Sequence, residues 1–215
     1  MHKGFSFESA LLDGMMLLLE KDANNVLVGG IDEITNISYS ILNRFNLYRR
    51  EEGSNFDLFK IESKGTIAGE GAAFFLLTNE ASSNDYAELN GISTFYKPAD
   101  IRETEQQILS FLSSQSVNIN DIDLIVAGRN GDVKNDSIYT QLQQTIFQNK
   151  ALANYKHLCG EYPTSTAFAL WLAANMLKTG TVPAITGAQK SNPKKILVYN
   201  HYQNTHHSLL LLSAC

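Results

Sequence analysis

The sequence predicts a layered α/β fold. Helical stripes of apolar residues recur along the chain, and short apolar runs of strand length lie between them. The composition agrees, because 44% of the 215 residues are hydrophobic and 18% are charged, as in an ordinary globular protein. A chain of this length is also long enough to bury a core of its own.

The first third of the chain is expected to form two helices and two strands. Residues 5–20 are apolar at most positions, which is typical of a helix buried on nearly all sides. Residues 25–28 predict a buried strand that ends in a tight turn at Gly29-Gly30. Further along, the pattern predicts a helix at 37–48, a polar loop at 50–66 and a strand at 72–77.

A polar hinge at residues 80–85 is the best candidate boundary, and it divides the chain into parts 1–80 and 81–215. The second part is expected to contain strands at 86–95, 122–127, 196–199 and 208–213, and helices at 101–112, 137–147 and 164–177. Thr164 is a suitable N-cap for the last helix, and Gly180 is a suitable C-terminal stop.

Charge and cysteine content exclude several classes of protein. The net charge of −5 gives no electrostatic basis for a nucleic-acid partner. The two cysteines, Cys159 and Cys215, form no disulfide framework and suit a reducing compartment. No apolar stretch is long enough to span a membrane, and the first residues lack the apolar region of a signal peptide. We therefore expect a cytoplasmic protein without a cofactor or a metal.

Five short motifs occur in an order and spacing that together are fairly specific. They are Val26-Leu-Val-Gly-Gly-Ile-Asp-Glu33, Gly69-Glu-Gly-Ala-Ala-Phe-Phe-Leu-Leu77, Ala87-Glu-Leu-Asn-Gly91, Asp121-Ile-Asp-Leu-Ile125 and Lys156-His-Leu-Cys-Gly-Glu161. In this order the chain resembles the β-ketoacyl synthases, condensing enzymes of the thiolase fold. The resemblance covers nearly all of the chain. It implies a thiolase-like layered αβαβα architecture, N-terminally truncated relative to the family.

The resemblance also implies where the chemistry of the family would lie. In these enzymes a cysteine accepts an acyl group from an acyl carrier protein, and two histidines stabilise the charge that develops as a malonyl thioester loses carbon dioxide. The corresponding positions here hold Gly4 for the cysteine, and Gly128 and Glu161 for the histidines. Only Lys156 of the family's site is retained. The resemblance therefore predicts that this chain does not carry out ordinary condensation.

The first functional hypothesis is a non-catalytic ketosynthase homologue that resembles a chain-length factor of fatty-acid-like, polyene or polyketide biosynthesis. The implied partners are an acyl carrier protein and either an active ketosynthase or a second copy of the chain. Candidate substrate-binding residues are Phe5, Phe7, Tyr202 and Asn204, the last two in the 201–206 loop that lines the site in the family. The alternatives are a divergent active synthase or acyltransferase, and a truncated product without activity.

Other residue patterns each allow a functional and a structural interpretation. Gly4-Phe-Ser-Phe-Glu8 partly matches a nucleophile elbow, but Ser6 is more simply a helix cap. Cys159 beside His157 could be a thiol–base pair, although a small buried cysteine is more common. His201, His206 and His207 could suggest a metal, but His206 and His207 would point to opposite faces of a strand. Without the histidine network, Lys156 is expected to pair with Glu161.

Overall fold

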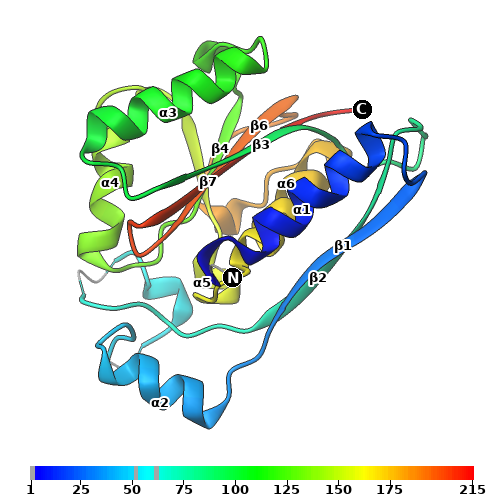
Figure 1. The fold of residues 1–215 in the computed structure, drawn as a ribbon. Coiled ribbons are helices and arrows are strands. Elements are labelled where there is room, and N and C mark those ends of the chain that lie inside the picture. The colour runs from blue at the N-terminus through cyan, green and yellow to red at the C-terminus, as the bar shows by residue number, and fades with distance from the viewer. Residues whose placement is uncertain (1–2, 51–52, 61–62) are drawn as a thin grey trace.

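The structure, a computed structural model, describes residues 3–50, 53–60 and 63–215. Its largest element is a five-stranded sheet in the order β3-β7-β6-β4-β5 (Figure 1). The strands are β3 (Glu88–Tyr96), β4 (Leu124–Ala127), β5 (Ala151–Asn154), β6 (Lys195–Tyr202) and β7 (His206–Ser213). β4 runs parallel to β5 and β6, whereas β7 runs antiparallel to β6 and β3.

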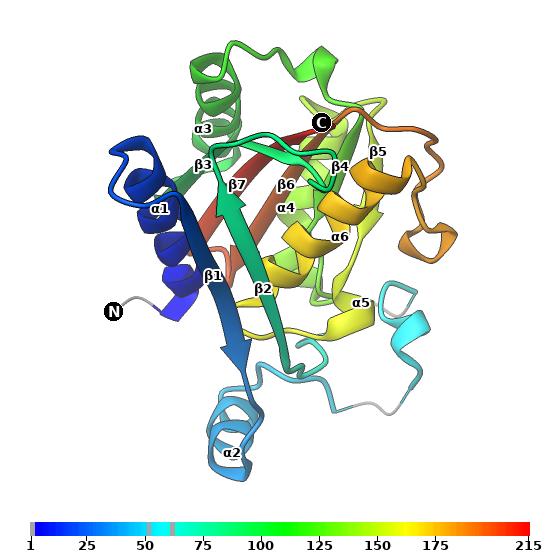
Figure 2. The same cartoon turned by 90° about the vertical axis from the view of Figure 1, so that its right-hand side faces the viewer.

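A second sheet consists of β1 (Asn25–Asp32) and β2 (Gly71–Thr78), which pair antiparallel. Helices α1 (Ser6–Leu19) and α6 (Ser165–Thr179) lie between the two sheets (Figures 1 and 2). Helices α3 (Ile101–Ser114) and α4 (Val133–Gln144) cover the opposite face of the five-stranded sheet. The described part of the chain therefore has four layers, in the order α, β, α, β, which confirms the predicted layered α/β class.

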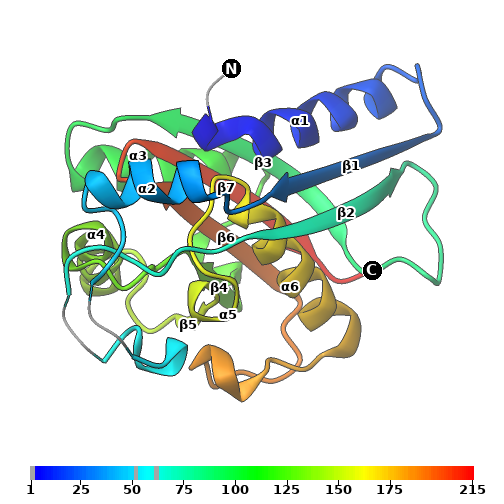
Figure 3. The same cartoon turned by 90° about the horizontal axis from the view of Figure 1, so that it is seen from below.

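The remaining helical elements lie in connections. Helix α2 (Asn36–Arg44) and a 3-10 turn at Asn55–Asp57 belong to the long excursion between β1 and β2 (Figure 3). Helix α5 (Lys156–Cys159) joins β5 to α6, and further 3-10 turns lie at Lys3–Phe5, Ile119–Asp121 and Ala184–Thr186. Side-chain caps fix where several helices begin, since Thr35, Asp100 and Asp132 accept hydrogen bonds from backbone N–H groups of α2, α3 and α4.

Two hydrophobic cores hold these layers together. The inner core lies between the sheets and joins α1 and α6 to inward-facing residues such as Val28, Val198 and Leu210. The outer core lies under α3 and α4, where Leu197 and Leu211 pack against Ile108 and Leu142. Because β4 contributes to both cores, all four of its residues are buried. This explains its unbroken apolar sequence.

Several sequence predictions need correction. β1 continues through Gly29 and Gly30 to Asp32 instead of turning, because a glycine at 29 makes room for the Phe74 ring on the paired strand. Neither β1 nor α1 is buried on both sides, since one face of each is exposed. α4 begins at Val133, four residues earlier than predicted. β5 and α5 are too short to give a periodic signal and were not predicted. The loop predicted at 50–66 includes residues 51–52 and 61–62, which lie outside the described part.

Candidate functional site

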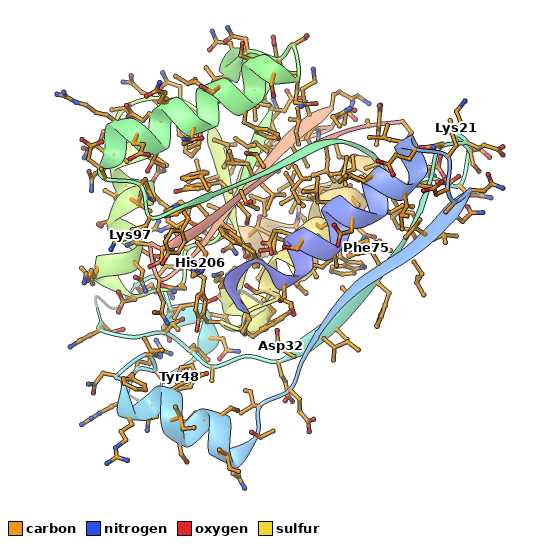
Figure 4. The ribbon with its side chains drawn as sticks, viewed as in Figure 1. Lys21, Asp32, Tyr48, Phe75, Lys97 and His206 are labelled. Carbon is orange, nitrogen blue, oxygen red and sulfur yellow. The ribbon has the colours of Figure 1, made fainter. Side chains whose placement is uncertain are left out.

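The position expected for the nucleophile is closed by a histidine. Gly4 is buried in the 3-10 turn that leads into α1. A Cβ atom built on Gly4 would lie 2.6 Å from Cγ of His206, the first residue of β7. Figure 4 shows His206 beside the start of α1, and its ring packs edge-on against Phe5, with centroids 4.8 Å apart. A cysteine at position 4 would therefore require His206 to move.

An asparagine fills the space beside Gly128, which follows β4. A Cβ atom on Gly128 would overlap Oδ1 of Asn200 and would lie 2.9 Å from the Tyr139 hydroxyl. Asn200 is buried in β6, where its Nδ2 donates a 2.8 Å hydrogen bond to Oγ1 of Thr166. The expected histidine position thus has neither an imidazole nor room for one.

Glu161, at the other expected histidine position, forms a buried ion pair. Nζ of Lys156 lies 2.8 Å from Oε1 and 2.7 Å from Oε2 of Glu161, and both residues are buried. Nδ2 of Asn130 donates a further 2.8 Å hydrogen bond to Oε2. The predicted pairing of Lys156 with Glu161 is confirmed, and it satisfies both charges within the protein.

The loop that presents Asn130 is held by Asp136 near the start of α4. Its Oδ1 accepts a 2.8 Å hydrogen bond from the backbone N–H of Asn130, and its Oδ2 accepts one of 3.0 Å from Gly131. Arg129 Nε lies 3.6 Å from Oδ2. A positive φ of 83° at Gly131 lets the loop turn tightly, since glycine adopts the left-handed region without steric cost. This arrangement fixes the Asn130 amide against Glu161.

Glu8 is a buried acid that the sequence reasoning missed. It lies on α1 and is buried, with the hydroxyl groups of Thr166 and Ser208 nearby. Burial raises the pKa of Glu8 above its ordinary value, although these neighbouring hydroxyl groups and the charge of Lys156 oppose the shift. Glu8 falls on the same helical stripe as Phe7 and Leu11, which are buried. An acid on the buried stripe of a helix was the signal that could have found it.

Two of the three histidines near the C-terminus share one face of the five-stranded sheet. Nδ1 of His207 lies 3.0 Å from the Tyr199 hydroxyl, and Nε2 of His201 lies 3.1 Å from the Asn135 carbonyl oxygen. Burial lowers the pKa of His207 to about 4 and holds the pKa of His201 well below its usual value, so both rings are neutral at neutral pH. His206 packs on Phe5 and Tyr96 instead, consistent with the prediction that His206 and His207 point to opposite faces.

A small cavity lies beside the ion pair. It measures about 30 Å³ and includes Tyr48, Asn130, Glu161 and Tyr202 in its lining, and Figure 4 labels Tyr48 at the side of α2. This volume is about that of one water molecule. It is far smaller than an acyl chain.

The four candidate substrate-binding residues lie in different surroundings. Tyr202 lines the small cavity, whereas Phe7 is buried in the inner core. Phe5 packs on His206. Asn204 lies in the hairpin turn between β6 and β7, where its Nδ2 donates to the Lys134 carbonyl oxygen at 3.3 Å. The structure therefore does not bring all four together around one cavity.

The alternative nucleophiles lack the surroundings that would activate them. Burial raises the pKa of Cys159 to about 12, and its thiol lies 3.4 Å from the Gly160 carbonyl oxygen. His157 Nε2 instead lies 2.9 Å from the Ile185 carbonyl oxygen. Ser6 is the first residue of α1 and Phe5 holds the cap position, so the prediction of Ser6 as the cap is wrong. A 3-10 turn, not a strand, precedes Ser6, unlike in a nucleophile elbow.

The described residues contain neither a metal-binding cluster nor a membrane-spanning helix. Residues 3–50, 53–60 and 63–215 contain no group of three or more His, Cys, Asp or Glu side chains placed to hold a metal ion. Within the same residues, no helix combines the length and the apolar character that crossing a membrane requires.

Thr164 does hold the N-cap position of α6, but its hydroxyl donates to Oδ2 of Asp32 at 2.6 Å instead of capping the helix.

Comparison with known proteins finds similarity in structure but not in sequence. No protein-family model matches the chain, and no curated protein sequence matches it. Among solved structures, the ishigamide ketosynthase/chain length factor matches with a TM-score of 0.80 at 16% identity, over 98% of this chain and 59% of that one. A type II polyketide ketosynthase in complex with its acyl carrier protein, bound to the hexaketide, matches with a TM-score of 0.82 at 15% identity.

A β-ketoacyl synthase from Burkholderia phymatum matches with a TM-score of 0.74 at 15% identity, over 98% of this chain and 60% of that one. The polyketide ketosynthase in complex with its carrier protein is covered over 61% of its length by 99% of this chain. The chain therefore spans about three fifths of the length of these structures. Over that length it has the thiolase-like fold of the ketosynthases and chain length factors, as the ordered motifs predicted.

Proposed function

We propose that this chain is a non-catalytic ketosynthase homologue that acts like a chain-length factor in fatty-acid-like, polyene or polyketide biosynthesis. The proposal rests on the three positions expected for the condensing chemistry, because none of them holds a group that could perform it. His206 fills the space at Gly4, Asn200 fills the space at Gly128, and Lys156 neutralises Glu161.

Each replacement removes a group that the reaction needs. Glycine at position 4 offers no nucleophile to accept an acyl group. Gly128 offers no donor to a developing oxyanion, and loss of one such donor costs about 10² to 10³ in rate. The oxygens of Glu161 accept hydrogen bonds from Lys156 and Asn130, so Glu161 offers no donor that could stabilise an enolate. Both the acyl transfer and the stabilisation of the developing charge are affected, so one compensating residue would not restore turnover.

The proposed partners are an acyl carrier protein and an active ketosynthase, or a second copy of the chain in place of the ketosynthase. One structural neighbour is a ketosynthase in complex with an acyl carrier protein, which supports this choice. We propose a cytoplasmic setting, because such carrier-protein chemistry requires reduced thiols and the chain has two free cysteines.

The proposal is tested by incubating the chain with acyl- and malonyl-loaded carrier proteins and measuring products and protein adducts by mass spectrometry. We expect no condensation and no covalent acyl adduct. The Cys159→Ser variant is the matched control, because Cys159 is the alternative thiol nucleophile. Turnover above background in the unmodified chain would refute the proposal. An adduct lost in Cys159→Ser would instead identify a divergent acyltransferase.

A further inference from the structure

A lysine, an asparagine and a glutamate from separate segments meet in the interior of the protein. Lys156 is the first residue of α5 and is fully buried. Asn130 lies in the loop that follows β4 and is 2% exposed, whereas Glu161 follows α5 and is 8% exposed. Oε2 of Glu161 lies 2.7 Å from Nζ of Lys156 and 2.8 Å from Nδ2 of Asn130. The amine and the amide nitrogen therefore lie no farther apart than the sum of those two distances.

These three side chains have complementary reactivities. An uncharged lysine amine is a nucleophile, an amide carbonyl carbon is an electrophile, and a carboxylate can carry a proton between them. Burial favours the reaction, because moving one proton from Nζ to Glu161 leaves two uncharged groups that lose little by the absence of water. The centre of the Tyr155 ring lies 5.9 Å from Nζ, and Tyr155 is itself fully buried, so this ring helps to keep water away from the amine.

The Asn130 side chain is held in one orientation by both of its polar atoms. Its Oδ1 accepts a 3.1 Å hydrogen bond from the backbone N–H of Asp132, and its Nδ2 donates to Glu161. A donor on the carbonyl oxygen stabilises the negative charge that this oxygen gains when a nucleophile adds to the carbon. The backbone N–H of Gly131, whose attack on the same carbon would give a succinimide, donates instead to Asp136 at 3.0 Å. The arrangement therefore favours the lysine amine as the nucleophile.

The small cavity beside the ion pair offers a place for a leaving group. Asn130 and Glu161 both line it, together with Tyr48 and Tyr202, and it measures about 30 Å³. This is about the volume of one water molecule, and ammonia is similar in size. Ammonia released from the Asn130 amide would therefore enter a space that already exists in the fold.

We propose that Lys156 and Asn130 become joined by an intramolecular amide bond, with Glu161 as the proton carrier. Nζ first passes a proton to the Glu161 carboxylate and then attacks Cγ of Asn130. The Nζ–Cγ bond forms, the Cγ–Nδ2 bond breaks, and Nδ2 leaves as ammonia with a proton that Glu161 delivers. Lys156 gives up two protons in all, one that leaves with the ammonia and one that remains on Glu161. No oxidant or reductant is needed, and the ion pair is the state before the reaction.

The new bond would tie the loop after β4 to α5, two segments that the chain otherwise connects through α4 and β5. A covalent link across this span removes freedom from the unfolded chain, as a disulfide does, so it should raise the unfolding temperature. The inference goes beyond the proposed function and does not rest on it, because the bond requires neither an acyl group nor a carrier protein. Its failure would leave the proposed lack of condensation untouched.

Mass spectrometry of the purified 215-residue chain tests the proposal without any substrate. We expect the folded protein, after several days at neutral pH, to weigh about 17 Da less than its sequence, which is the mass of one ammonia molecule. Digestion should then release a branched peptide in which Lys156 is joined to Asn130. Lys156→Arg and Glu161→Gln should both keep the full mass, since the first lacks the nucleophile and the second lacks the proton carrier. Lys134→Arg is the matched control, because Lys134 is exposed, and it should still lose the ammonia.

A further variant identifies the atoms that react. Asn130→Asp retains the carbonyl carbon but would lose water in place of ammonia, so its product should have the same mass as the product of the unmodified chain. The full sequence mass in the unmodified folded chain would overturn the proposal, and so would the absence of the branched peptide. A loss of ammonia that persists in Lys156→Arg would also overturn it, because that result would identify a succinimide at Asn130-Gly131 or Asn90-Gly91 instead of the proposed bond.

Discussion

Nζ of Lys156 lies within 2.8 Å of both carboxylate oxygens of Glu161, and both side chains are buried. A buried pair of this kind is costly to break, because removal of one partner leaves the other charge without compensation in a low-dielectric interior. The pair therefore serves the structure of the turn between α5 and α6, which holds it beside Asn130.

The first prediction concerns this ion pair. Lys156→Met should destabilise the protein by about 3–5 kcal/mol, because it leaves the Glu161 carboxylate buried and paired only with an amide. The double variant Lys156→Met/Glu161→Gln should recover part of that loss, because no charge then remains. Denaturant unfolding of the single and double variants measures both. Equal stability of Lys156→Met and the double variant would show that the pair is not coupled as its geometry indicates.

The second prediction concerns pH and Glu8. Burial raises the pKa of Glu8 in the folded protein above its ordinary value of 4.5. The folded state therefore holds the proton more tightly than the unfolded state. The stability that this tighter proton binding contributes is fully present below pH 4.5, and it is lost as the pH rises through the pKa of Glu8 in the folded protein. Glu8→Gln has no such proton, so its stability relative to the unmodified protein should increase between pH 4 and pH 8.

Glu20→Gln is the matched control for this experiment, because Glu20 follows the same helix but is exposed. Urea unfolding at both pH values provides the measurement. A Glu8→Gln protein with the same pH dependence as the unmodified chain would contradict the prediction, and so would an equal effect of Glu20→Gln.

The third prediction concerns the space beside Gly128. Gly128→Ala should destabilise the protein by about 1–3 kcal/mol, because the new methyl group would overlap the Asn200 side chain. The same change in an Asn200→Ala background should cost much less. Gly53→Ala is a suitable control, since its Cβ would meet only Arg49 Nη2 at 3.6 Å. The test compares the unfolding free energies of the unmodified protein, Gly128→Ala, Asn200→Ala, their double variant and Gly53→Ala. Additive effects at 128 and 200 would count against direct contact.

The fourth prediction concerns Cys159. A thiol with a pKa of about 12 is almost entirely protonated at neutral pH, so it should react slowly with iodoacetamide. In a Cys215→Ser variant, the alkylation rate should rise about tenfold for each pH unit between 7 and 9. The exposed Cys215, measured in Cys159→Ser, should react at least roughly 100-fold faster at pH 7. Rapid modification of Cys159 at pH 7 would contradict this prediction and would support Cys159 as a nucleophile.

The elements with long periodic patterns could be predicted from the sequence, and those set by tertiary contacts could not. The helices at 101–114 and 165–179 and the strands around 72–77 and 208–213 have clear apolar periods, and they were placed correctly. The strand predicted at 25–28 ended before β1 does, because Gly29-Gly30 is a strong local turn signal. Only the Phe74 ring, which lies 45 residues away in sequence, explains why glycine occupies a strand there.

Prediction of the candidate site from the sequence was limited in the same way. The sequence suggested that Lys156 and Glu161 pair, because the histidine network that this lysine supports in the resembling family is missing here. It could not place His206 against Gly4 or Asn200 against Gly128, since each contact joins segments at least 70 residues apart. These long-range contacts depend on strand register, which a local pattern does not specify.

The last prediction concerns the state of the chain in solution. Leu12, Met16 and Leu19 on α1 are exposed, as are Leu27, Phe74 and Leu76 on the strand pair beside it. Full burial of one such side chain is worth roughly 1.5–3 kcal/mol, so exposing six of them strongly favours association. We therefore expect the purified 215-residue chain to self-associate, as measured by light scattering at tens of micromolar. Leu27→Lys/Leu76→Lys should shift it toward the monomer, because the two lysines interrupt the apolar face at paired positions, whereas Leu109→Lys on α3 should not. A cooperative, fully monomeric unmodified chain at that concentration would show that this face needs no cover.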